Sequence, residues 1–157
     1  IPKFFTATEF RLVRTLADIV IPKDERSGSA TDAGVPEFMD FIIADQKRLQ
    51  TPVRGGLAWL DVHTRRKVGK SFVEASDAER RGVLDEIAYP GDFDPSVAHG
   101  VAFFNLFRDL TASGFWSTKE GMADVGYRGN QVLTEWKGAP QEEMDRLGLT
   151  FDDWAVA

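Results

Sequence analysis

Signals that start and stop helices recur along the first 114 residues, and no segment alternates apolar and polar residues as a half-buried strand would. Capping boxes, in which a hydroxyl residue is followed three positions later by glutamate, occur at Thr6–Glu9 and Ser76–Glu79. Asp94 followed by Pro95 is a third start signal, because proline is tolerated in the first helical turn. These signals predict an all-α fold.

The spacing of apolar residues between these signals predicts a bundle of five to six helices. The first begins after Thr6 and is ended by Pro22, and the second begins at Pro36 and buries Phe38, Phe41 and Ile42, with Met39 and Ile43 at the edge of that face. The others are expected to open at Thr51–Pro52, after Ser76 and after Asp94, with a last short helix near Pro140. Gly114 is interpreted as the stop of the helix that follows Asp94.

The size and composition of the chain fit one helical domain over residues 1–157. With 157 residues, of which 43% are hydrophobic and 28% charged, the chain is long enough to build a buried core. The periodic pattern ends near Gly114. We therefore expect a helical core over residues 1–114 and an irregular, partner-docking tail with one short helix over residues 115–157.

Aromatic residues are concentrated in the last predicted helix before Gly114 and in the stretch after it, which has no helical period. Seven lie between Phe103 and Trp136, and from Gly114 onward glycines interrupt the sequence, so the rings have no regular element to cover them. Tryptophan and tyrosine are frequent anchors of protein interfaces. The predicted partner interface consists of Phe115, Trp116, Tyr127, Asn130, Trp136 and Trp154. The alternative interpretation is that these rings cover the core of the domain itself.

Charge and composition argue against several partners. The net charge of -6 disfavours nucleic acid, and the basic run Arg65, Arg66, Lys67 and Lys70 is better explained as the solvated end of a helix. No apolar run approaches the length of a membrane span. Without cysteine, disulfides and thiolate ligands are excluded.

Residues that carry chemistry are few and scattered. The two histidines, His63 and His99, lie far apart and neither begins a metal-binding spacing, so both are interpreted as surface or half-buried residues. Asp109, the carboxylate nearest to an apolar run, is adjacent to Arg108 and is more simply explained as an ion-pair partner. No nucleophile elbow or dinucleotide-binding turn is recognisable. We expect no catalytic, cofactor-binding or metal-binding residue in this chain.

The order of several segments resembles the gluconate 2-dehydrogenase subunit 3 family over nearly the whole chain. The segments are FFTATEFRLVRTLADIVIP, AGVPEFMDFI, GLAWLD, FFNLFRDLTASGFW and GYRGNQVLTEWKGAP. The most specific are the first helix with its terminal Ile-Pro, the AGVPEF start and the phenylalanine-rich helix. The closing segment is similar to the branch whose large partners are sugar or glycoside dehydrogenases.

The resemblance implies a small, non-catalytic subunit that stabilises and escorts a large partner. That partner would be an FAD-dependent sugar dehydrogenase of the glucose-methanol-choline type, with FAD in the partner and cytochrome c often receiving the electrons. Members of the family commonly carry a twin-arginine export signal, which implies a periplasmic complex. The chain begins at Ile1 and not at methionine, which fits removal of such a signal.

Two other functional classes remain open from the residues alone. One is a free-standing helical binding or regulatory module, including a module for nucleic acid, which the acidity of the chain disfavours. The other is a small enzyme that uses carboxylates. Turnover of a sugar by the isolated chain, without any flavoprotein, would support the enzyme.

Overall fold

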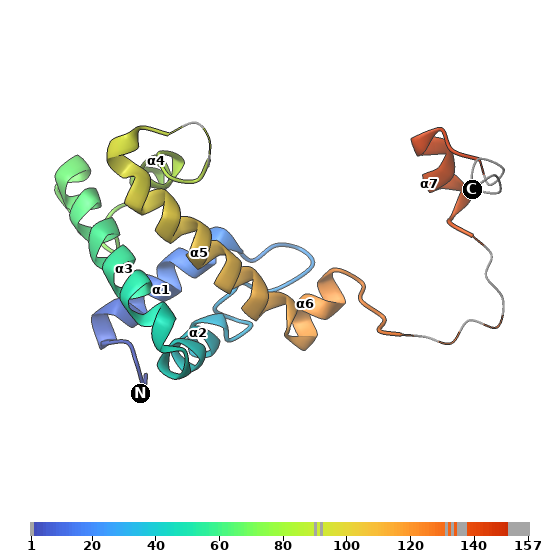
Figure 1. Ribbon diagram of the computed structural model, residues 1–157, viewed down its shortest axis with the longest axis horizontal. Coiled ribbons are helices and arrows are strands. Elements are labelled where there is room, and N and C mark those ends of the chain that lie inside the picture. Colours follow the sequence, from blue (N-terminus) through green and yellow to red (C-terminus); the bar gives the residue numbers. More distant parts are fainter. Residues whose placement is uncertain are drawn as a thin grey trace. The chain divides into compact units, whose positions relative to one another are not determined.

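The computed structural model describes residues 2–150 except 90, 92, 131, 133 and 135–137. Across these residues it contains seven α-helices, one short 3-10 helix and no strand, which confirms the all-α prediction (Figure 1). None of the helices in the described part is long and apolar enough to cross a lipid bilayer. The chain divides into two compact units, residues 1–127 and 128–157.

Six of the seven α-helices lie in the first unit, and the second unit contains the seventh. Their bounds are α1 Ala7–Val20, α2 Val35–Asp45, α3 Lys47–Val68, α4 Asp77–Asp85, η1 Pro95–Val97, α5 Ala98–Trp116, α6 Lys119–Asp124 and α7 Gln141–Leu147. The helical core therefore continues past residue 114, where the sequence predicted that it would end, because α6 packs on α5.

Both predicted capping boxes are present. The Thr6 and Ser76 hydroxyls accept hydrogen bonds from the backbone N–H groups of Glu9 and Glu79, and each glutamate accepts one from the backbone of its capping residue. Hydrogen bonds from the Ser76 backbone and from Lys70 lower the pKa of Glu79 to about 2. Both caps are local features, because each pair is only three residues apart, so the sequence was sufficient to predict them.

The start of α3 differs from the prediction. The helix begins at Lys47, so Pro52 lies inside it and not in its first turn. Leu49 is buried in the core, and the side-chain amide of Gln50 donates hydrogen bonds to the carbonyl oxygens of Ile43 and Ala44 at the end of α2. These tertiary contacts stabilise the turn before Pro52, which local signals alone do not favour.

The buried face of α2 is also rotated from the expected one. Met39 and Ile43 are fully buried, whereas Phe41 is 60% exposed and Phe38 and Ile42 are only partly buried. The buried residues face the neighbouring helices α1, α3 and α5, against which α2 packs. The apolar stripe of this helix is wide, so its neighbours decide which part of it is buried.

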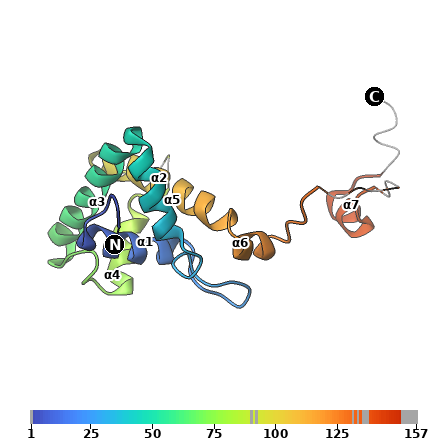
Figure 2. The same cartoon turned by 90° about the horizontal axis from the view of Figure 1, so that it is seen from below.

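The centre of the first unit is the contact between α3 and α5, which lie side by side in Figures 1 and 2. A glycine on each helix receives an aromatic ring from the other. A Cβ at Gly56 would overlap the ring of Phe103, and a Cβ at Gly100 would overlap the ring of Trp59. The two helices therefore approach closely where they meet, because both backbones lack a side chain there.

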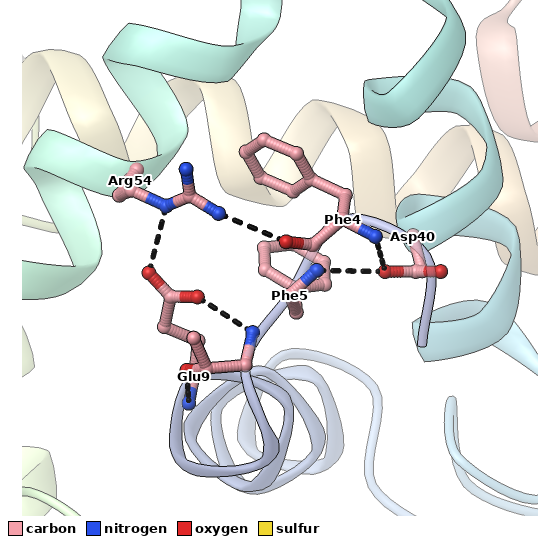
Figure 3. Close-up of polar contacts among 6 residues, drawn as sticks. Phe4, Phe5, Glu9, Asp40 and Arg54 are labelled. Carbon is pink, nitrogen blue, oxygen red and sulfur yellow. Dashed lines mark hydrogen bonds and ion pairs between the residues drawn. The ribbon is translucent and has the colours of Figure 1, made fainter. Parts of the chain in front are cut away.

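The N-terminal residues are fastened to three helices by Asp40 and Arg54 (Figure 3). The Asp40 carboxylate on α2 accepts hydrogen bonds from the backbone N–H groups of Lys3, at 2.5 Å, and of Phe4 and Phe5, each at 2.9 Å. Arg54 on α3 donates to Glu9 on α1 at 2.9 Å and to the Phe4 carbonyl at 2.8 Å. The segment before α1 thus joins α1, α2 and α3.

Burial of Asp40 acts to raise its pKa, because a charged group is less stable away from water. The three backbone N–H groups and the nearby Lys3 charge outweigh this effect, so the pKa of Asp40 is lowered overall. Asp40 is therefore ionised at neutral pH and acts as a fixed acceptor for the N-terminal segment.

Candidate partner-docking surface

The last turn of α5 places two adjacent aromatic residues in different environments. Phe115 is 1% exposed and belongs to the core, whereas Trp116 is 44% exposed. Their rings meet edge to face, with centroids 5.6 Å apart and an interplanar angle of 88°. Phe115 therefore offers no free surface to a partner, contrary to the sequence prediction, and instead supports Trp116 from inside.

Gly114 does not stop α5, which continues to Trp116. A Cβ at Gly114 would lie 2.8 Å from Cδ1 of Phe38 on α2. The glycine is thus a point of close contact between α5 and α2. Local sequence does not reveal such a contact, because Phe38 is far away along the chain.

Tyr127 follows a well-defined end of α6. Thr118 caps the start of this short helix by accepting a hydrogen bond from the Gly121 N–H at 3.0 Å. At its end Gly126 has a φ of 67°, and the Tyr127 N–H donates to the Met122 carbonyl at 2.8 Å. This is the hydrogen bond of a Schellman motif, which favours glycine at the left-handed position. Tyr127 is 64% exposed just beyond it.

The connection between α1 and α2 also contacts α6. The Arg26 guanidinium donates to the Asp124 carbonyl and lies 3.3 Å from the Asp124 carboxylate, and the Gly28 N–H donates to the Glu120 carboxylate. The position of α6 on α5 therefore depends on residues about 100 positions away.

One further apolar residue is exposed in the same region, Val125 at 57%. Together, Trp116, Val125 and Tyr127 are called the α5–α6 surface below. Sequence reasoning missed Val125, although an apolar residue between a short helix and a glycine could have indicated it. Monomeric proteins expose single apolar residues commonly, but three within the short segment from the end of α5 to the end of α6 favour a contact surface.

The three other predicted interface residues are Asn130, Trp136 and Trp154. Asn130 is exposed and lies in the second unit. Trp136 and Trp154 lie outside the described residues. Of the six predicted residues, the structure therefore brings Phe115, Trp116 and Tyr127 to the end of α5 and to α6, and only the last two of these are exposed.

A second apolar feature is a groove of about 380 Å³ between α3 and α5. Its lining consists of Thr51, Pro52, Gly55, Gly56, Trp59, His99, Ala102, Phe103 and Leu106. The lining is mainly apolar, so the groove suits an apolar side chain better than a charged or strongly polar ligand.

The residues considered for chemistry lie in ordinary structural settings. His63 is half-buried, stacks on Trp59 with centroids 4.6 Å apart, and its Nε2 lies 3.0 Å from a Glu86 oxygen. His99 is exposed. Asp109 is exposed and pairs with Arg108 at 3.2 Å. In the part of the chain that the structure describes, no three histidine or acidic side chains gather as metal ligands would.

Comparison with known proteins identifies one family. Gluconate 2-dehydrogenase subunit 3 matches residues 7–138, which confirms the resemblance inferred from the sequence motifs. No curated protein and no solved structure matches the chain.

Proposed function

The chain belongs to the gluconate 2-dehydrogenase subunit 3 family, and from this membership we propose that it is the non-catalytic small subunit of an FAD-dependent sugar dehydrogenase. The large subunit would be a glucose-methanol-choline type flavoprotein that binds FAD and oxidises the sugar. The small subunit would stabilise this partner by packing against it.

The observation that carries this proposal is the α5–α6 surface. Trp116 and Tyr127 are 44% and 64% exposed, although α6, which lies between them, is held in place by its caps and by contacts from the connection between α1 and α2. An ordered aromatic residue loses little conformational entropy on binding, and burying such rings is a frequent source of interface affinity. The exposed rings of this surface therefore favour burial against a partner protein.

The family also motivates the location and the electron acceptor. We propose that the complex acts in the periplasm, that the two chains are exported together after folding, and that a cytochrome c accepts electrons from the FAD of the large subunit. A folded and FAD-loaded partner needs a companion that is itself folded before export. The all-α unit of residues 1–127, with one continuous core, meets that requirement.

The test is to replace Trp116 and Tyr127 by alanine, singly and together, and to measure binding to the purified FAD-containing large subunit from the same source. Each single substitution is expected to raise Kd about thirtyfold, which corresponds to roughly 2 kcal/mol for an interface anchor. Flavin absorbance of the material that co-purifies with the tagged chain gives an independent measure of the complex.

Tyr89→Ala is the matched control, because Tyr89 is 66% exposed but follows α4, away from the α5–α6 surface. It should bind as the unchanged chain does. Unchanged binding of both Trp116→Ala and Tyr127→Ala would contradict this interface. Oxidation of a sugar by the isolated chain with an artificial acceptor, without flavoprotein, would contradict the non-catalytic role.

A further inference from the structure

The α5–α6 surface is too small to hold a stable partner by itself. Aromatic side chains bury at most about 250 Å² each, so Trp116, Tyr127 and the smaller Val125, at 44%, 64% and 57% exposed, offer no more than roughly 410 Å² together. A stable complex buries about 800 Å² on each partner. A partner that binds Trp116 must therefore also cover neighbouring surface.

One face of α5 leads from Trp116 to the groove between α3 and α5. Residues on it follow one another at alternating steps of three and four, which places them in one line along the helix. They are His99, Ala102, Leu106, Asp109, Ser113 and Trp116. Leu106 is partly buried and the other five are exposed, and the line runs about 26 Å along the helix. We call it the α5 stripe.

Gly55 is the feature of the groove that the packing of this chain does not explain. Its neighbour Gly56 is required, because a Cβ there would overlap Phe103, but a Cβ at Gly55 would meet no atom within 4 Å. Glycine inside a helix destabilises it relative to alanine. Gly55 therefore keeps the groove open at a cost in stability, with no compensating contact within the described residues.

We propose that an amphipathic helix of the large subunit lies along the α5 stripe and inserts an apolar side chain into the α3–α5 groove above Gly55. A helix is the proposed occupant because the side-chain ridges of one helix, at steps of three and four, pack into the grooves of another. Ala102 and Ser113 are small enough for that helix to approach closely. The inference rests on the proposed function, because it assigns the same partner to a longer surface that continues from Trp116.

The decisive variant is Gly55→Leu, which fills the groove from the open side without touching the core. Because a Cβ at Gly55 meets only open space and leucine favours helix, the melting temperature should be unchanged or higher. Kd for the purified FAD-containing large subunit should rise at least tenfold. Gly82→Leu is the matched control, since Gly82 is an exposed glycine within α4 and its Cβ would also meet no atom within 4 Å. Its Kd should stay within twofold.

A second variant keeps the test decisive if leucine at Gly55 lowers the melting temperature. Ala102→Arg places a long cation on the exposed stripe, where no core contact is lost, and should also raise Kd at least tenfold. If both variants bind as the unchanged chain does while Trp116→Ala and Tyr127→Ala weaken binding, the large subunit does not bind along the α5 stripe. The proposed function then stands without this inference.

Two further results would overturn the inference in other ways. If the unchanged chain does not bind the large subunit, the proposed function fails together with it. If Gly55→Leu leaves that binding intact but converts a self-associated chain into a monomer in sedimentation, the occupant of the groove is a second copy of this chain.

Discussion

Asp40 is the residue on which the N-terminal segment depends most. Its carboxylate accepts hydrogen bonds from the backbone N–H groups of Lys3, Phe4 and Phe5. One side chain thus pairs three donors that no helix or strand pairs. Phe5 is 5% exposed and Asp40 itself 6% exposed. Loss of the carboxylate would therefore leave several donors without a partner in a region that excludes most water.

Asp40→Asn should lower the free energy of unfolding at pH 7 by about 1–3 kcal/mol, because the amide presents one acceptor and its own N–H groups to these donors. The folded pKa of Asp40 lies below its unfolded value, so the stabilisation is present above about pH 4 and is lost as pH falls through the folded pKa. Urea unfolding of Asp40→Asn and of the unchanged chain, measured between pH 7 and pH 2.5, should show that the difference in their free energies of unfolding becomes smaller in acid.

Asp45→Asn, on the exposed end of the same helix, is the control for a lost carboxylate and should change the unfolding free energy by less than about 0.5 kcal/mol. Equal stability of Asp40→Asn and the unchanged chain at pH 7 would show that the hydrogen bonds between Asp40 and the N-terminal segment do not stabilise the fold.

Among the helices, α6 depends most on its neighbours. It spans only Lys119–Asp124, which is too short to be stable alone. Its start is capped by Thr118, and its glycine at position 121 lies against the backbone of Phe115. Arg26 and Gly28 donate hydrogen bonds to two other residues of the helix. The exposed position of Tyr127 follows from these contacts and not from an intrinsic preference of the segment for helix.

Gly121→Ala should detach α6, because the added Cβ would overlap the Phe115 carbonyl and neighbouring backbone that cannot move aside. The expected loss in the free energy of unfolding is about 1–3 kcal/mol, and the amides of α6 should exchange with solvent faster than those of α5. Hydrogen exchange measured by mass spectrometry provides the readout for each helix.

The same substitution at Gly82 in α4 is the control, since a Cβ there meets open space. It should raise stability by about 0.5–1 kcal/mol through helix propensity. If Gly121→Ala and Gly82→Ala had the same free energy of unfolding and the same rates of amide exchange in α6, the position of α6 would not depend on its close packing against α5.

At the level of the whole molecule, the core belongs to the first unit. Among the described residues, the main cluster of buried apolar side chains extends from Phe5 to Phe115, and the second unit adds only Met144 as a buried apolar residue of its own. The stability of residues 1–127 is therefore expected to be independent of residues 128–157.

A chain ending at Tyr127 should keep its melting temperature within about 3 °C of the full chain, because it retains the whole core cluster. The same truncation removes Asn130, Trp136 and Trp154 of the predicted interface. Calorimetry and binding to the FAD-containing large subunit test the two consequences separately. A large drop in melting temperature would contradict the independence of the first unit, and unchanged binding would exclude those three residues from the interface.

Much of the fold and part of the candidate site could be predicted from local signals. The capping boxes at Thr6 and Ser76 lie within one helical turn, and the exposed Trp116 and Tyr127 lie in the stretch that the aromatic composition indicated. The order of the motifs was enough to predict the family, because those motifs are themselves short segments of sequence.

Contacts between residues far apart decided the rest. Phe115 and Trp116 are adjacent aromatic residues, yet only the packing of α5 and α6 makes one core and the other surface. Gly55 and Gly56 are likewise adjacent, and only the position of Phe103 makes one indispensable and leaves the other open. Sequence spacing predicts which residues share a helix, but burial depends on which helices meet, and that is a property of the tertiary structure alone.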